Sequence, residues 1–120
     1  MPKTVLVVED YDDVRMMMKI LINWHGYDVI EAADGYEAIE KSTQHRPDLI
    51  LMDLALPLLD GATAMRIIRK IEGLEKISIV AVTAFANTSF NKAIEAGFDD
   101  VIKKPLHFEN LEPLLNHYLA

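Results

Sequence analysis

Short runs of aliphatic residues alternate along this chain with segments in which apolar residues recur at helical spacing. Each run is followed at once, or within two residues, by polar side chains. Continuous apolar runs of this kind are typical of strands buried on both faces of a parallel sheet. The runs are Val5–Val8, Leu49–Met52, Ile79–Val82 and Val101–Ile102.

The segments between the runs have the period expected of helices that bury one face. In the first of them, Val14, Met18 and Leu21 fall on a common side. Strands and helices therefore alternate over the whole chain. We predict strands at 3–8, 27–31, 48–53, 78–83 and 99–103, and helices at 12–24, 35–44, 61–72, 87–96 and 107–119.

Turn-forming residues stand where these helices begin and end. Gly26 and Gly97 follow the first and fourth helices, as C-terminal caps would, and Asp60-Gly61 precedes the third. Repeated βα units with short, right-handed connections favour an α/β fold, a (βα)5 doubly wound parallel sheet with helices on both faces. For the strand order we adopt 2-1-3-4-5, the common flavodoxin-like solution for five strands.

Length and charge limit the function. The 120 residues are enough for one core, so we expect residues 1–120 to form a single domain with no effector domain. The formal net charge of −7 argues against direct nucleic-acid binding, which requires clustered Lys and Arg. With no membrane-length apolar stretch, no leader and no cysteine, a cytoplasmic location away from membranes is expected.

Chemically capable side chains fall just past the ends of four predicted strands: Glu9, Asp10, Asp53, Thr83 and Lys104. In an open parallel sheet the ligand crevice lies at the carboxyl ends of the strands. Three carboxylates brought together there would repel by about 4 kcal/mol per pair at roughly 4 Å and an effective dielectric of about 20. Oxygen ligands without His or Cys suit a hard cation, and Mg²⁺ is our first choice because it retains waters for a phosphate ligand.

Each of these residues also has a purely structural explanation. The pair Glu9-Asp10 is well suited to cap the following helix, and Asp53 to stabilise a turn. Thr83 would be an ordinary hydroxyl cap, and a lone lysine such as Lys104 is usually solvated. Together, however, the strand ends supply metal ligands, a carboxylate nucleophile, a hydroxyl donor and a cation, which are the groups that Mg²⁺-dependent phosphoryl transfer requires.

Taken as motifs, these residues resemble the bacterial response-regulator receiver domain of the stand-alone, chemotaxis-regulator kind, over essentially the whole chain. The resemblance rests on Glu9-Asp10, on Met52-Asp53-Leu54-Ala55-Leu56-Pro57 followed by Asp60-Gly61, on Thr83-Ala84 and on Lys104-Pro105. It implies a phospho-accepting signalling switch of a two-component system or phosphorelay. The phosphoryl donor would be a sensor histidine kinase or a histidine phosphotransfer protein, and the output a downstream protein in trans. Such a regulator catalyses only its own phosphorylation and dephosphorylation.

The resemblance also implies a role for each acidic residue. Asp53 would be the phosphoacceptor. Asp10 and Asp53 would ligate Mg²⁺ directly, Glu9 would act mainly through a bound water, and the backbone carbonyl of Ala55 would complete the protein's share of the coordination.

Thr83 and Lys104 would hold phosphoryl oxygens. Lys104 is preferred to Lys103 because the family's lysine directly precedes a proline, and in the family that bond is cis. Side chains alternate along a strand, so Lys103 should point away from whatever Lys104 addresses.

Three positions depart from the family's usual pattern. The aromatic residue normally found three positions before the lysine is Val101, and a valine cannot make the large rotamer change that accompanies the family's switch. Ala55 and Phe85 cannot orient an attacking water by hydrogen bonding, so a fairly long-lived phosphoryl group is predicted. Phe85 is either a partner contact or ordinary packing. Candidates for an output face are Phe85, Thr88, Asn91, Lys92 and Lys103.

Three other functions compete with this interpretation. A phosphatase or mutase of the haloacid-dehalogenase type needs a second aspartate where Ala55 stands. A flavin-binding protein needs a phosphate loop where Glu9-Asp10 would repel the anion. A degenerate receiver that acts only as an interaction module would lack some of the five site residues, all of which are present here.

Overall fold

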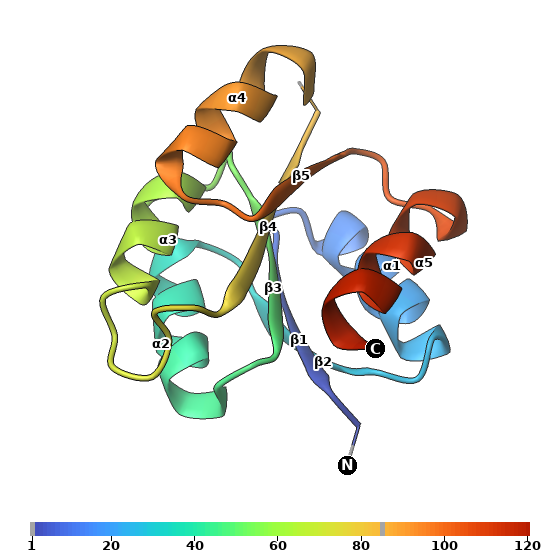
Figure 1. Cartoon of the computed structure of the whole chain (residues 1–120). Coiled ribbons are helices and arrows are strands. Elements are labelled where there is room, and N and C mark those ends of the chain that lie inside the picture. The colour runs from blue at the N-terminus through green and yellow to red at the C-terminus, as the bar shows by residue number, and fades with distance from the viewer. Residues whose placement is uncertain (1, 85) are drawn as a thin grey trace.

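The computed structural model describes residues 2–84 and 86–120, with the side chains of residues 86–89 excepted. Strands and helices alternate along the chain, as the pattern predicts (Figure 1). The strands are β1 (Thr4–Val8), β2 (Asp28–Ala32), β3 (Leu49–Asp53), β4 (Ser78–Thr83) and β5 (Asp100–Lys103). The helices are α1 (Asp12–Trp24), α2 (Gly35–His45), α3 (Gly61–Ile68), α4 (Ala86–Ala96) and α5 (Phe108–Leu119).

The strands form one parallel sheet in the order β2-β1-β3-β4-β5, which confirms the predicted topology. The register aligns the ends of neighbouring strands. Val8, the last residue of β1, pairs with Ala32 at the end of β2 and with Met52 near the end of β3. Because all strands run the same way, the loops that follow β1, β3, β4 and β5 emerge at one edge of the sheet.

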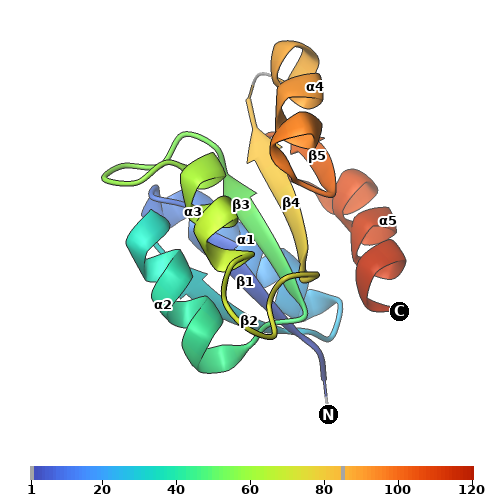
Figure 2. The same ribbon diagram turned by 60° about the vertical axis from the view of Figure 1, so that its left-hand side comes forward.

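Helices cover both faces of the sheet, with α1 and α5 on one side and α2, α3 and α4 on the other (Figures 1 and 2). Successive residues of a strand point to opposite faces, so each strand contributes to two cores. Val5 and Val7 pack in the core that contains Ile22 of α1, whereas Leu6 packs in the core that contains Met65 of α3. Among the described residues, every helix is too short or too polar to cross a bilayer.

The third helix ends earlier than predicted, at Ile68 instead of residue 72. Beyond it the hydrogen bonds span three residues, from the Lys70 N–H to the Ile67 carbonyl and from the Ile71 N–H to the Ile68 carbonyl. The side chain of Arg69 donates to the Ile77 carbonyl at 2.8 Å and holds the chain as it turns back toward β4. This tertiary contact overrides the helical pattern of the sequence.

The start of α3 is held close to the end of β3. Asp60 caps the helix by accepting a hydrogen bond from the Thr63 N–H at 2.9 Å, as the Asp-Gly pair predicts. A Cβ atom placed on Gly61 would lie 2.2 Å from the backbone oxygen of Asp53, so only glycine fits at this contact. The end of β3 is thereby fixed next to the site described below.

Candidate functional site

Three carboxylates meet at the carboxyl edge of the sheet. Glu9, Asp10 and Asp53 each present an oxygen, and these oxygens all lie within 4.8 Å of one another. The first two residues follow β1 and the third ends β3, and the pairing of β1 with β3 makes them neighbours. Glu9 and Asp53 are buried, whereas Asp10 is half-buried. The predicted convergence of the acidic residues is therefore confirmed.

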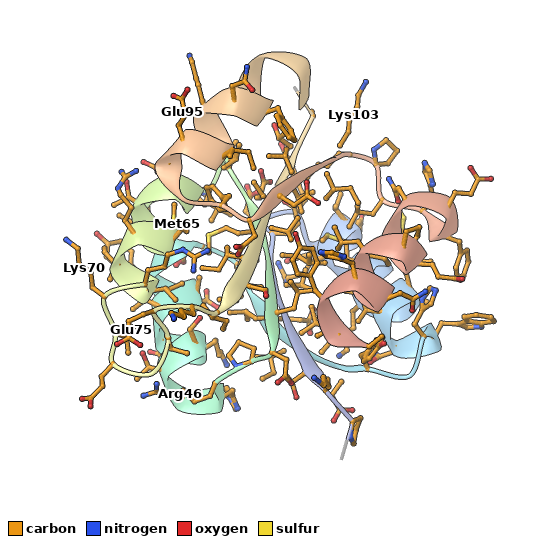
Figure 3. The ribbon with its side chains drawn as sticks, in the orientation of Figure 1. Arg46, Met65, Lys70, Glu75, Glu95 and Lys103 are labelled. Atoms are coloured by element: carbon orange, nitrogen blue, oxygen red, sulfur yellow. The ribbon has the colours of Figure 1, made fainter. Side chains whose placement is uncertain are left out.

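Lys104 brings a positive charge to this cluster. Its Nζ donates to Asp53 Oδ2 at 2.7 Å and also to Glu9 Oε1. The backbone N–H of Lys104 donates to the carbonyl of Thr83 at 2.9 Å, which fixes the lysine beside the end of β4. The Lys104-Pro105 peptide bond is cis, as the resemblance implies. Lys103 is exposed and projects outward from the end of β5, as predicted (Figure 3).

The charges of the cluster perturb each other. Burial, together with the charge of Asp53, raises the pKa of Glu9, although the hydrogen bond from Lys104 works in the opposite direction. Burial of the Lys104 ammonium would lower its pKa, but the hydrogen bonds and charges of Asp53 and Glu9 outweigh burial and raise it. Three ionised carboxylates and one ammonium leave two negative charges, which a divalent cation would neutralise.

Asp10 provides a second reason to place a cation here. Its Oδ1 atom is buried and has no hydrogen-bond partner within the part of the chain that the structure describes. A buried carboxylate oxygen left without a partner is costly. An oxygen-only donor set with one such unpartnered atom fits Mg²⁺, which prefers carboxylate oxygens and water.

The two carboxylate oxygens of Asp53 have different partners. Its Oδ1 accepts a hydrogen bond from the Ala55 N–H at 3.0 Å and so stabilises the turn after β3. Its Oδ2 faces Lys104 in the cluster. Thr83 is buried at the end of β4, the strand that pairs with β3. Coordination by the Ala55 carbonyl stays a prediction.

Capping accounts for only part of the acidic pair. Glu9 Oε2 accepts a hydrogen bond from the Tyr11 N–H at 3.2 Å, so this side chain does contact the start of α1. The N-cap residue itself is Tyr11, whose side chain makes no capping hydrogen bond to the described residues. The purely structural explanation thus covers one oxygen of Glu9 and leaves Asp10 unexplained.

The candidate output face is only partly described. Asn91 and Lys92 of α4 are exposed, and so is Lys103. Val101 is partly buried and packs against the core beneath α2, α3 and α4. Phe85 and the side chain of Thr88 lie outside the described residues, so those two predictions stay open.

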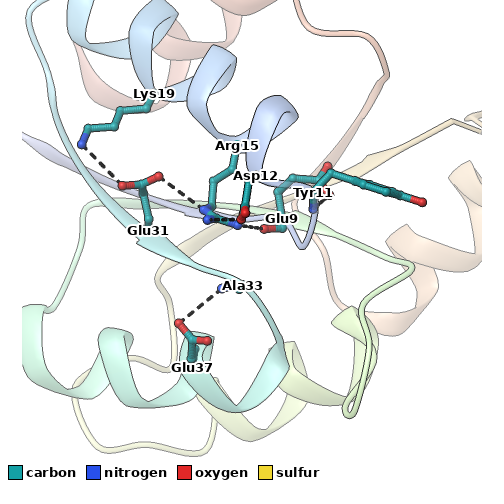
Figure 4. Close-up of polar contacts among 8 residues, drawn as sticks. All are labelled: Glu9, Tyr11, Asp12, Arg15, Lys19, Glu31, Ala33 and Glu37. Carbon is teal, nitrogen blue, oxygen red and sulfur yellow. Dashed lines mark hydrogen bonds and ion pairs between the residues drawn. The ribbon is translucent and has the colours of Figure 1, made fainter.

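No sequence motif assigns a role to Arg15, yet Arg15 contacts the loop that carries Glu9 and Asp10. From the first turn of α1 its Nη1 donates to the backbone carbonyl of Glu9 at 2.8 Å (Figure 4). A weak signal was present, because Arg15 lies three residues after Asp12, a spacing that pairs charges on a helix. That spacing identifies a surface ion pair but not a contact with Glu9.

Fold and site together define a class of protein, a doubly wound α/β domain with an acidic cluster and a lysine at the carboxyl edge of its sheet. The family model of the response regulator receiver domain matches residues 5–116. The chain belongs to this family and is a receiver domain of two-component signalling.

Curated relatives and solved structures agree with this assignment. The chain is 35% identical to the polar-differentiation response regulator DivK of Brucella anthropi, covering 100% of this chain and 98% of that protein. It is 33% identical to the chemotaxis protein CheY of Bacillus subtilis over 99% of each. The receiver domain of a sensor histidine kinase from Pseudomonas aeruginosa superposes with a TM-score of 0.91 at 33% identity, covering 98% of both chains. That structure has a magnesium ion coordinated in its active-site cleft.

Proposed function

We propose that Asp53 is the phosphoacceptor of this receiver domain and that it takes its phosphoryl group, with Mg²⁺, from a phosphohistidine of a sensor histidine kinase or a histidine phosphotransfer protein. One observation carries the proposal. The Lys104 ammonium bridges Asp53 and Glu9, beside an Asp10 oxygen for which the described part of the chain supplies no hydrogen-bond partner. This arrangement supports the proposal because the residues that would act as nucleophile, as cation for the phosphoryl oxygens and as metal ligands lie within one small cluster.

The reaction needs positioning more than covalent assistance. A carboxylate oxygen of Asp53 forms a bond to phosphorus while the bond between phosphorus and the donor nitrogen breaks, and the histidine keeps that electron pair. The Lys104 ammonium, already in contact with Asp53, would then donate hydrogen bonds to the new phosphoryl oxygens and stabilise their negative charge. The Thr83 hydroxyl donates to another of them. Deleting either group removes stabilisation of the charge on the transferring group.

The metal ligands would be Asp10 and Asp53 directly, Glu9 through a water, and the backbone carbonyl of Ala55. When bound, Mg²⁺ neutralises the acidic cluster and the charge on the phosphoryl oxygens. The magnesium ion in the Pseudomonas aeruginosa receiver structure supports this choice of cation. The excess of carboxylates over ammonium groups in the cluster also supports it, because the single Lys104 cannot neutralise three carboxylates.

The remaining steps follow from the same site. The domain would catalyse its own phosphorylation and dephosphorylation and act on no separate substrate. The Ala55 methyl group cannot orient an attacking water, which favours a long-lived phosphoryl group. Residues 1–120 would act as one cytoplasmic domain that signals to a downstream protein in trans, without direct contact with nucleic acid or membrane.

Intact-mass spectrometry tests the proposal. The protein is incubated with acetyl phosphate and Mg²⁺, and we expect a mass increase of one phosphoryl group. The increase should vanish with a chelator and in Asp53→Asn. Modification that persists in either arm contradicts the proposed site. A second arm with a phosphorylated histidine phosphotransfer domain should give the same product and the same dependence on Asp53.

A further inference from the structure

Arg15 joins three segments of the chain next to the acidic cluster. Besides the Glu9 carbonyl, its guanidinium donates from Nη2 to Asp12 Oδ1 at 2.7 Å and from Nε to Glu31 Oε1 on β2 at 3.3 Å (Figure 4). The side chain is 17% exposed. The planar fork of an arginine can satisfy several acceptors at once in a fixed geometry. One side chain therefore connects α1, β2 and the loop after β1.

Both backbone polar groups of Glu9 are held by hydrogen bonds. Strand β1 ends at Val8, but the Glu9 N–H still donates to the Ala32 carbonyl of β2 at 3.0 Å. The Glu9 carbonyl accepts a hydrogen bond from Arg15 Nη1 at 2.8 Å. With both groups fixed, the Glu9 side chain is directed toward Lys104, and Asp10 is the next residue of the same backbone.

We propose that Arg15 is a positioning residue that holds Glu9 and Asp10 in the orientation required to bind the cation. It touches neither the metal nor the phosphoryl group. Asp12 and Glu31 neutralise its charge, so its contribution is geometric. This inference rests on the proposed function, because the cation that Glu9 and Asp10 would bind is the Mg²⁺ of that reaction.

Removing Arg15 would change the Mg²⁺ affinity in opposite directions, depending on whether its charge or its hydrogen bonds matter, and this makes the inference testable. If only its positive charge mattered, removing it would strengthen the binding of a divalent cation. If it positions the ligands, removing it weakens binding, as the loss of outer-shell partners of metal ligands generally does. If Arg15 only formed structural salt bridges, removing it would lower the melting temperature but leave the Mg²⁺ affinity of the folded protein unchanged.

Lys19 provides a matched control. Lys19 carries the same charge on the same helix. Its Nζ contacts Glu31 Oε2 at 3.4 Å, and Arg15 contacts the other oxygen of the same carboxylate. Lys19 has no hydrogen bond to Glu9 among the described contacts. Arg15→Met and Lys19→Met therefore remove the same charge, but only Arg15→Met releases the Glu9 carbonyl.

The experiment is a calorimetric titration of each folded protein with Mg²⁺. We expect Arg15→Met to raise the Mg²⁺ Kd about tenfold or more and Lys19→Met to change it by less than about twofold. At saturating Mg²⁺ the phosphorylation rate of Arg15→Met should recover to within about threefold of wild type, because Arg15 does not touch the reacting atoms. An unchanged or lowered Kd in Arg15→Met, or equal weakening in both variants, overturns the inference.

Two further arms keep the result unambiguous. If Arg15→Met does not fold, Arg15→Lys replaces it, since lysine keeps the charge but cannot reproduce the fork. An unchanged Kd in Arg15→Lys then overturns the inference. If the wild type itself binds no Mg²⁺, the proposed function fails. If the wild type binds Mg²⁺ and Arg15→Met has the same Kd, only the role of Arg15 is removed.

Discussion

Asp10→Asn should make the metal-free protein more stable while weakening its response to Mg²⁺. The wild-type side chain is a half-buried carboxylate that lies near two others, and its buried Oδ1 atom has no hydrogen-bond partner among the described residues. Lys104 contacts Glu9 and Asp53 and leaves Asp10 as the least compensated member of the cluster. An amide of the same shape removes the repulsion and can donate to a neighbouring carboxylate.

The magnitude follows from the geometry of the cluster. At the 4.8 Å limit on the distances between the three oxygens, two unit charges repel by about 3 kcal/mol at an effective dielectric of about 20, and by about 1 kcal/mol in water. Asp10 experiences two repulsions, from Glu9 and Asp53, and one attraction from Lys104, so roughly one repulsion remains. We expect Asp10→Asn to raise the free energy of unfolding by about 1–3 kcal/mol in the absence of metal.

Urea unfolding with a chelator and with Mg²⁺ measures both effects. Mg²⁺ stabilises whichever protein binds it, by about 2.7 kcal/mol at a concentration of about 100 times the Kd. The advantage of Asp10→Asn should therefore shrink or reverse when Mg²⁺ is added. Asp13→Asn is the control, because Asp13 is exposed in the first turn of α1 and its change removes the same charge.

The electrostatic account would be refuted by an Asp10→Asn variant that is less stable than wild type in the chelator. It would also be refuted if Asp13→Asn stabilised the protein equally, since the gain would then reflect the net charge of −7 and not the cluster. Equal stabilisation of Asp10→Asn and wild type by Mg²⁺ would show that Asp10 is not a ligand.

Two further predictions concern the turns beside the site. Asp60→Ala should lower the free energy of unfolding by about 1 kcal/mol at neutral pH, because it removes the cap of α3. The hydrogen bond from the Thr63 N–H lowers the pKa of Asp60 below its ordinary 3.8, so the charged cap contributes above that pH and its contribution is lost as the pH falls through the folded-state pKa. The difference in free energy of unfolding between wild type and Asp60→Ala, measured in urea, should narrow as the pH falls through the folded-state pKa. A difference that widens would count against the cap. Ala55→Asn should shorten the half-life of the phosphorylated protein severalfold. Intact-mass spectrometry after removal of the phosphodonor measures this half-life. An unchanged half-life would show that a water-orienting side chain is not what the site lacks.

The sheet and the acidic cluster were predictable because both depend on a short-range pattern. Apolar runs identify parallel strands, parallel strands end at one edge, and polar residues just after them must meet there. Combined with the adopted flavodoxin-like strand order, this reasoning brought Glu9, Asp10 and Asp53 together correctly. Lys104 was distinguished from Lys103 chiefly by the proline that follows it, as in the family that the chain resembles.

The features that escaped prediction depend on contacts between distant parts of the chain. The end of α3 is set by Arg69, which reaches carbonyls outside the helix. Arg15 reaches Glu31, which is 16 residues away, and a carbonyl of the preceding loop. A long, flexible arginine has many possible acceptors, and the sequence does not specify which one it meets. That Asp10 Oδ1 has no partner among the described residues is likewise visible only once the neighbouring donors have been placed.

The most direct test of the central claim is to identify the modified residue. After phosphorylation with acetyl phosphate and Mg²⁺, borohydride reduction converts an aspartyl phosphate into homoserine, which tandem mass spectrometry can locate. We predict homoserine at position 53 alone, unaffected by Asp60→Asn, which keeps the α3 cap, and absent without Mg²⁺. Homoserine at residue 10 or 60 with Asp53 intact would contradict the assignment of Asp53 as the phosphoacceptor.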